Sequence, residues 1–142
     1  MRWDAATALE RFRSSRVARL ATVSADGTPH LVPVTFALSV DSAAPEIVIA
    51  VDHKPKSTTD LRRLRNIEAT GRVSVLADEY DEDWTQLWWV RLDGIARILA
   101  PGPDCAGPIA LLTAKYPQYQ GNTPTGPVIR IEVDSVRGWS YS

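Results

Sequence analysis

The chain has few of the side chains that most often carry chemistry on their own. Its 142 residues include one cysteine, Cys105, and two histidines, His30 and His53, which stand far apart. A single cysteine excludes a disulfide framework within the chain. No cysteine or histidine pair has the spacing of metal ligands, so a metal site is not expected. Cys105 lies in a Pro/Gly-rich stretch without a nearby histidine, and we interpret it as structural.

The chain also lacks a strong excess of charge and a long hydrophobic run. Its 16 basic and 17 acidic residues give a net charge of −1 and a pI of about 6.1. A nucleic-acid-binding domain usually carries a clear basic excess, so no nucleic-acid partner is expected. No apolar run has the length of a membrane span, and the first residues do not resemble a signal peptide. We therefore expect a cytoplasmic protein without a membrane partner.

No self-sufficient catalytic set is recognisable. The sequence contains no Ser/His/Asp arrangement at a nucleophile elbow, no Walker loop, no GxGxxG and no HExxH. If the protein is an enzyme, a cofactor is expected to carry the chemistry, with the protein supplying binding and orientation. We therefore assign no catalytic residue. The length and the 44% hydrophobic content predict a single domain, residues 1–142, with its own core.

The hydrophobic patterns predict a mainly β fold. Strands are predicted at residues 16–24, 30–38, 46–51, 72–77, 85–99 and 128–133, with a short seventh at 138–141. Short helices are predicted after Asp4, after Ser57 and over residues 109–116. Most connections are short, which favours antiparallel pairing, and closure hides the sheet edges. The expected fold is a six- to seven-stranded antiparallel barrel with a few short helices.

Three positions within the predicted strands carry specific expectations. Pro33 removes a backbone donor, so its strand should lie at an edge or carry a bulge. Gly94, in mid-strand, predicts a bulge or a close approach of another backbone. The adjacent Trp88 and Trp89 should point to opposite faces of the sheet. One of them is expected in the core, and the other against a helix, a ligand or another subunit.

A basic segment with Lys54 and Lys56, here called the lysine stretch, follows the apolar run 47–51. Lys54 and Lys56 stand just before Ser57, which lies three residues ahead of Asp60 at the spacing of a capping box. Two ammonium groups at the N-terminus of a helix would stabilise an anion, most naturally a phosphate. The alternative is a solvated basic loop before an ordinary capped helix.

Several segments in this order and spacing resemble a known family. They are residues 19–30, 31–34, 52–57, 61–67, 72–75 and 88–94. The chain resembles the pyridoxamine 5′-phosphate oxidase-like, split-barrel flavin-binding family over nearly its whole length. More specifically, it is similar to the actinobacterial branch that uses the deazaflavin coenzyme F-420.

The resemblance implies a homodimer with cofactor sites between the subunits, and an oxidoreductase that passes a hydride between reduced F-420 and a small conjugated acceptor. It implies that the strand at residues 30–35 lies along the cofactor ring, that the lysine stretch takes the phosphate, and that Arg62 or Arg63 reaches an acidic tail. The tryptophans would come from the partner subunit. The implied cofactor-binding residues are His30, Val32, Pro33, Val34, Val51, His53, Lys54, Lys56, Ser57, Thr58, Arg62, Trp88, Trp89 and Trp139.

Alternatives remain open within and beyond this family. The flavin mononucleotide (FMN) and deazaflavin branches share the phosphate loop, so an FMN-dependent oxidase is the main alternative. A cofactor-binding or carrier module without turnover is another. Synthesis of pyridoxal phosphate is not expected, because Arg137 is alone near the C-terminus, where those enzymes carry several basic residues. A haem-binding role is disfavoured, because neither histidine has an obvious ligand setting.

Overall fold

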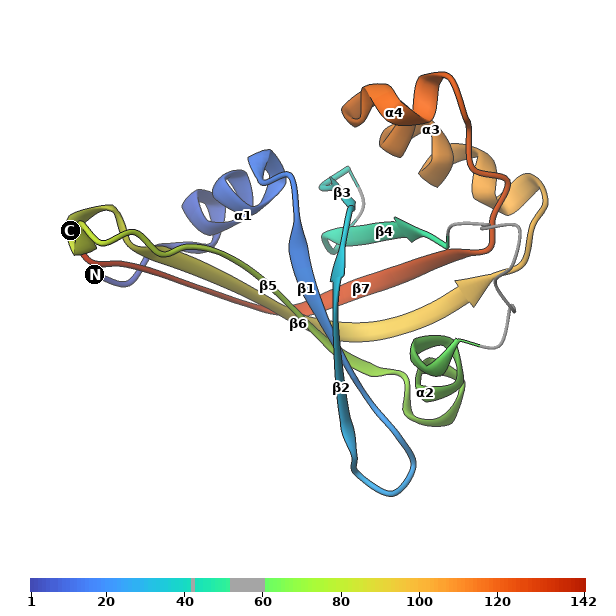
Figure 1. The fold of residues 1–142 in the computed structure, drawn as a ribbon, viewed down its shortest axis with the longest axis horizontal. Helices are drawn as coiled ribbons and strands as arrows, with labels where there is room; N and C mark the ends of the chain where they lie inside the picture. Colours follow the sequence, from blue (N-terminus) through green and yellow to red (C-terminus); the bar gives the residue numbers. More distant parts are fainter. Residues whose placement is uncertain (42, 52–60) are drawn as a thin grey trace.

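The computed structural model describes residues 1–41, 43–51 and 61–142. Its described part is mainly β, with seven strands in one antiparallel sheet and a few short helices, as expected (Figure 1). The strands are β1 Ala18–Val23, β2 Pro29–Val34, β3 Ala37–Ser39, β4 Glu46–Ala50, β5 Arg72–Glu79, β6 Trp88–Leu99 and β7 Val128–Ser140. The α-helices are α1 Ala5–Ser14, α2 Arg62–Thr70, α3 Ala106–Lys115 and α4 Pro117–Gln120.

The two edge strands of the sheet follow one another in the chain. The order is β2-β1-β5-β6-β7-β4-β3, so β2 and β3 are the two edges although they are consecutive in sequence. The sheet curls, and β1 and β2 cross over the long strands in Figure 1. Pro33 lies in the edge strand β2, opposite Arg19, which confirms the expectation of an edge position.

The predicted strand over residues 30–38 is wrong, because the structure divides it. β2 ends at Val34 and β3 begins at Ala37, with Thr35 and Phe36 between them. The hydroxyl of Tyr116 accepts a hydrogen bond from the Phe36 backbone N–H at 3.1 Å and lies 3.0 Å from the Phe36 carbonyl oxygen. A side chain from α3's C-terminal end thus occupies backbone groups that a strand partner would otherwise use.

The start predicted for the fifth strand is also wrong. β6 begins at Trp88, and Trp84–Gln86 form a 3₁₀ turn instead of strand. The carboxylate of Asp83 accepts hydrogen bonds from the Thr85 backbone N–H at 3.1 Å and from its hydroxyl at 2.6 Å. This local capping favours the turn over an extended chain.

The two C-terminal strands predicted separately form one strand, β7, which pairs with β6 along its length. The register between them shifts at Asp93 and Gly94, which confirms the predicted irregularity. A Cβ atom on Gly94 would lie 2.1 Å from the carbonyl oxygen of Glu132. Only glycine allows this approach of the two backbones.

Two hydrophobic clusters hold the sheet. The larger lies inside the curled sheet, where Phe12 of α1 meets Phe36 at 4.6 Å between ring centres. The smaller lies between α3 and the outer side of β3, β4 and β7, around Leu112. β4 contributes to both clusters, Ile47 to the first and Val48 to the second. Burial on both faces explains its continuous apolar sequence, and the prediction of a buried strand here is confirmed.

The helix boundaries follow their capping residues. Asp4 begins α1 as expected, and its carboxylate accepts from the Thr7 N–H at 2.8 Å. α2 begins at Arg62 with Leu61 at its N-cap and no side-chain capping bond. The capping box predicted at Ser57 and Asp60 lies outside the described residues. α3 begins at Ala106, before the predicted start, with Pro108 in its first turn. Across the ranges described, no helix has the length and apolar character needed to cross a bilayer.

Candidate functional site

The edge strand β2 is the first component of the candidate site. Among the described residues it pairs only with β1, so the other edge of its backbone is open. His30, Val32 and Val34 lie opposite Thr22, Leu20 and Ala18, which are buried inside the barrel. Opposed residues share a face of the sheet, so these three side chains are directed inward. Pro33 is exposed on the outer face.

His30 has an unused ring nitrogen. Its side chain is half-buried, and its Nδ1 atom is buried without a hydrogen-bond partner among the described residues. The neighbouring Thr22 is buried, and its hydroxyl accepts from the Nδ2 of Asn66 on α2 at 3.0 Å. Buried polar atoms are nearly always hydrogen-bonded, so a free Nδ1 indicates a position for a ligand. Thr22 and Asn66 were not found from the sequence, because their pairing depends on how α2 packs on β1.

The tryptophans divide between the two faces of the sheet, as expected. Trp88 is buried, stacks on Trp3 with 6.0 Å between ring centres, and donates from Nε1 to the carboxylate of Glu79 at 2.9 Å. Trp89 and Trp139 are both half-buried and lie opposite each other in register on β6 and β7. They therefore share the outer face, while Trp88 belongs to the core side.

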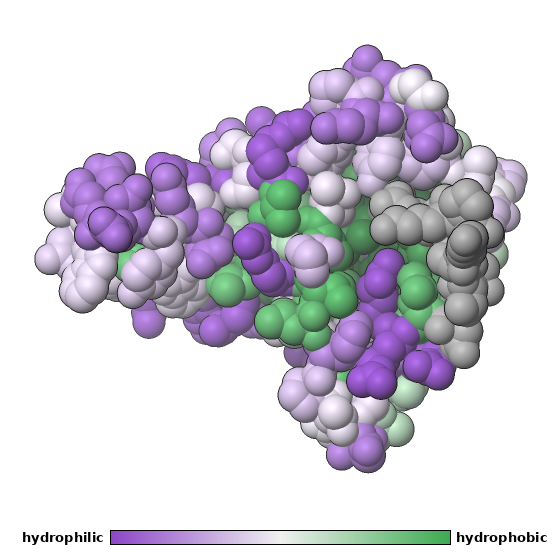
Figure 2. Space-filling view, in the orientation of Figure 1, coloured by the Kyte–Doolittle hydropathy of each residue, from purple (hydrophilic) through white to green (hydrophobic). Residues whose placement is uncertain are grey.

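An apolar groove of about 510 Å³ lies on the outer face. It extends from Leu31 on β2 to Trp89 on β6, and its charged lining residues are of both signs: Arg19, Arg91 and Asp78. Leu31 and Tyr80 are 66% and 72% exposed. Hydrophobic residues gather near the middle of the face shown in Figure 2, over the region where Figure 1 places β2. Large exposed apolar side chains that cluster commonly mark a binding surface.

A second groove, of about 640 Å³, lies between α2 and the end of β6. Its lining includes Leu64, Arg97 and Pro127. Val51 is buried, and its N–H donates to the carbonyl oxygen of Pro127 at 3.0 Å. The first residue after β4, Val51, therefore lies beside a residue that lines this groove.

The remaining predicted contacts are only partly visible. Arg62, at the start of α2, is exposed. Five of the predicted cofactor contacts lie outside the described residues; they are His53, Lys54, Lys56, Ser57 and Thr58. The described predicted residues do not meet in one pocket. The barrel side holds His30, Val32, Val34, Val51 and Trp88, and the outer face holds Pro33, Trp89 and Trp139. The set as a whole stays a prediction.

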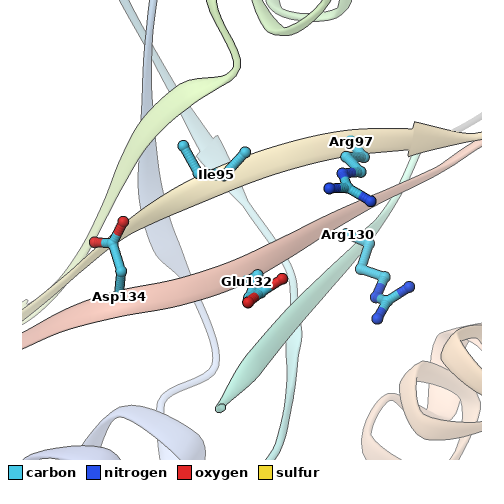
Figure 3. A pocket seen from close by; sticks show the side chains of 5 residues that line it. All are labelled: Ile95, Arg97, Arg130, Glu132 and Asp134. Atoms are coloured by element: carbon cyan, nitrogen blue, oxygen red, sulfur yellow. The ribbon is translucent and has the colours of Figure 1, made fainter. Parts of the chain in front are cut away.

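A smaller hollow of about 150 Å³ lies on the outer side of β6 and β7 (Figure 3). Arg97 and Arg130 lie opposite each other there. Arg130 is ion-paired with Glu46, and Asp134 is paired with Arg72 at 3.0 Å. Because these charges are compensated within the chain and the hollow is small, it is a poor candidate for a cofactor site.

The comparisons with known proteins agree with this architecture. A crystal structure of a conserved protein of unknown function from Corynebacterium diphtheriae has a TM-score of 0.72 at 22% identity, covering 100% of this chain and 98% of that one. An FAD-binding protein from Mesorhizobium loti has a TM-score of 0.68 at 22% identity, covering 97% and 95%. A haem storage protein from Vibrio cholerae has a TM-score of 0.65 at 17% identity, covering 94% of each chain. These likenesses show the fold.

No curated protein sequence matches the chain. The sequence profile of the pyridoxamine 5′-phosphate oxidase family matches residues 5–140, nearly the whole length. The strand order, the open edge at β2 and this profile lead to one conclusion: the chain belongs to the pyridoxamine 5′-phosphate oxidase family.

Proposed function

We propose that the protein is an oxidoreductase that binds a flavin-type cofactor, the deazaflavin coenzyme F-420. In this proposal a hydride passes between the reduced cofactor and a small conjugated organic acceptor. The observation that carries the proposal is the open edge of β2 beside His30, whose buried Nδ1 has no partner in the part of the chain described. A flat ring with polar edges can use both the free backbone groups and the imidazole.

The described residues fit such a ring in three ways. The outer edge of β2 offers unpaired backbone donors and acceptors next to Val32 and Val34. His30 offers a ring nitrogen that can donate or accept. The groove from Leu31 to Trp89 lies on the face opposite His30, so we propose that a second copy of the chain supplies its apolar wall to the ring. The ring's phosphate is assigned to the lysine stretch on the sequence alone.

When bound, the cofactor supplies the hydride-transfer chemistry, and the chain's residues bind and orient it. The β2 backbone fixes the ring's position, and His30 Nδ1 can exchange a proton at the ring edge. Apolar outer-face side chains of a second copy, Trp89 among them, would exclude water and so strengthen the polar contacts in the site. No other described side chain is needed as an acid or base.

We also propose that two copies of the chain form the functional unit. The predicted cofactor contacts lie on opposite faces of one sheet, with His30 inside and Trp89 and Trp139 outside. A second copy related by a two-fold axis can place its outer-face tryptophans against the first copy's β2. The exposed Leu31 and Tyr80 would then be covered.

The cofactor is tested by titrating the purified protein with F-420 and with FMN, following tryptophan fluorescence. Tight binding of F-420 alone supports the proposal. Preference for FMN moves the function to the oxidase branch of the family. Binding of neither compound contradicts the proposed cofactor class.

A matched pair of variants tests the lysine stretch. Lys56→Ala should weaken cofactor binding by at least about 1 kcal/mol, the lower range for a charge-assisted contact. Arg13→Ala removes one positive charge from α1 and should leave the affinity unchanged. Equal affinities of Lys56→Ala and the natural protein would make the stretch a solvated loop.

Turnover is tested with reduced F-420 and a panel of quinones, enoates and tetrapyrroles. Oxidation of the cofactor that depends on one acceptor class supports an enzyme and names its substrate class. Tight binding without transfer to any acceptor would instead make the protein a cofactor carrier.

A further inference from the structure

A buried ammonium group lies at the corner where α3 meets the barrel. The Nζ of Lys115 is buried without a hydrogen-bond partner among the described residues. It lies 3.7 Å from the centre of the Phe36 ring and 5.3 Å from that of Tyr116. Contact with ring faces stabilises a cation. It does not replace the three hydrogen bonds that an ammonium group makes in water, so the position is costly.

Among the residues that the structure describes, the charges that act on Lys115 are positive. Arg16 is exposed, and its guanidinium donates to the Lys115 carbonyl oxygen at 2.9 Å and lies 4.8 Å from the Tyr116 ring centre. Arg13 lies nearby on α1, where Glu10 is 3.4 Å from it. Within the described ranges, neither Lys115 nor Arg16 forms an ion pair with a carboxylate. Burial, followed by the charges of Arg16 and Arg13, lowers the pKa of Lys115 to about 8.

Helix dipoles explain only part of this arrangement. α1 ends at Ser14 and α3 ends at Lys115, and cations are favoured near the C-terminal ends of helices. That preference accounts for an exposed cation such as Arg16. It does not account for an ammonium group that is buried and left without an acceptor.

We propose that Lys115 and Arg16 form an anion-binding site that takes the carboxylate or phosphate group of a small molecule. Arg16 meets the anion at the surface, and the Lys115 side chain turns from the Phe36 ring to pair with it. A carboxylate or phosphate supplies several acceptor oxygens to ammonium and guanidinium donors. Both side chains lie among the described residues, and neither belongs to the lysine stretch of the sequence.

The position of the site suggests which molecule carries the anion. Tyr116 contacts both the Arg16 carbonyl oxygen and the Phe36 backbone, just beyond the end of β2. If the cofactor ring lies along β2, a step that rests on the proposed function, the bound anion belongs to the acceptor substrate. The anion site itself does not depend on that step.

The experiment measures thermal stability in phosphate, in acetate and in chloride at one ionic strength. Phosphate or acetate should raise the Tm of the natural protein saturably, by roughly 4 °C at about ten times the Kd. Lys115→Met should abolish this rise and Arg16→Gln should reduce it. Arg97→Gln, an exposed arginine on β6, is the matched control and should keep it. A rise with phosphate alone, or with acetate alone, identifies the anion class.

Phosphate could also bind at the lysine stretch, so Lys56→Ala is measured too and should retain the part of the rise that Lys115→Met removes. The chain has three lysines, Lys54, Lys56 and Lys115, which makes their NMR signals separable. Anion binding should raise the pKa of Lys115 specifically, a change that a purely structural lysine would not show. The proposal is overturned if neither anion exceeds chloride, if Lys115→Met responds like the natural protein, or if Lys56→Ala loses the rise. The F-420 titration of Lys115→Met should be unchanged, which separates this test from that of the cofactor.

Discussion

The hydroxyl of Tyr116 forms hydrogen bonds with the backbone of Phe36, which lies between the two edge strands β2 and β3. It accepts from the Phe36 N–H at 3.1 Å, and its proton is directed to the carbonyl oxygens of Arg16 at 2.9 Å and Phe36 at 3.0 Å. Tyr116 is 6% exposed, and burial raises the pKa of its hydroxyl. One hydroxyl thus joins three segments. They are Arg16 in the connection from α1 to β1, Phe36 between β2 and β3, and the C-terminal end of α3.

Replacing Tyr116 with phenylalanine tests this corner. Tyr116→Phe should destabilise the protein by about 1–3 kcal/mol, because the buried Phe36 N–H loses its acceptor. Urea unfolding measures the loss. Tyr141→Phe is the control, since Tyr141 is 52% exposed, and it should change the free energy of unfolding by less than about 0.5 kcal/mol. Equal effects of the two substitutions would contradict a structural role for the Tyr116 hydroxyl.

The close contact at Gly94 predicts a larger loss of stability than the one expected for Tyr116→Phe. Gly94→Ala would place a Cβ 2.1 Å from the Glu132 carbonyl oxygen, so β6 and β7 must separate. We expect a loss of at least about 3 kcal/mol, or failure to fold. Gly107→Ala in α3 meets nothing within 4 Å and should be neutral or stabilise by up to about 1 kcal/mol. Thermal unfolding of both variants checks the contrast.

The pKa of Lys115 predicts a pH dependence of stability. Its folded pKa is lowered from 10.5 to about 8, so between these values the unfolded chain binds the proton that the folded chain has lost. The contribution of Lys115 to stability therefore increases as pH rises from about 8 to 10.5. Lys115→Met should be more stable than the natural protein at pH 7, and the difference should shrink through this window. Urea midpoints across pH 7–11 measure it; a constant difference would contradict the assignment.

The outer-face groove predicts that one substitution weakens both dimer formation and cofactor binding. Leu31→Asp puts a charge at a side chain that is 66% exposed in one copy but covered in the proposed dimer. The variant should sediment as a monomer and bind the cofactor at least about tenfold more weakly. Its thermal stability measured at high dilution should match that of the natural protein. Val40→Asp, at another exposed apolar position, should leave both properties unchanged. A dimeric Leu31→Asp would place the interface elsewhere.

The sequence was a good guide where one local signal decides the structure. The hydrophobic run 46–51, the cap at Asp4 and the irregularity at Gly94 were all predicted and confirmed. Pro33 marked an edge strand because a missing donor has a local consequence. The antiparallel, mainly β class followed from alternation and short connections.

The failures arise where distant segments decide. Residues 30–38 alternate like one strand, but Tyr116, far along the chain, takes the backbone bonds of Phe36. The β7 strand is continuous because it pairs with β6 on both sides of the register shift at Asp93 and Gly94, and this pairing is not visible from the sequence of β7 alone. Lys115 gave no sequence signal, because its environment is created only when α3 packs over Phe36.

The candidate site was predicted in part. His30 is a predicted cofactor residue, and its buried Nδ1 has no partner in the described part of the chain. Its neighbours Thr22 and Asn66 were missed, because only the packing of α2 on β1 brings them together. The division of the tryptophans between two faces followed from the period of a strand.

The two hydrophobic clusters on either side of β4 have unequal size, and this has a consequence for motion. The cluster under α3 is small, so we expect α3 and α4 to detach from the barrel at a lower free energy than global unfolding. Amide hydrogens of α3 should then exchange with solvent faster than those of β4 and β7. Because Lys115 and Tyr116 sit at the end of this layer, the same opening controls access to the Phe36 corner. An anion bound to Arg16 and Lys115 would hold α3 against the barrel and slow the exchange of its amide hydrogens.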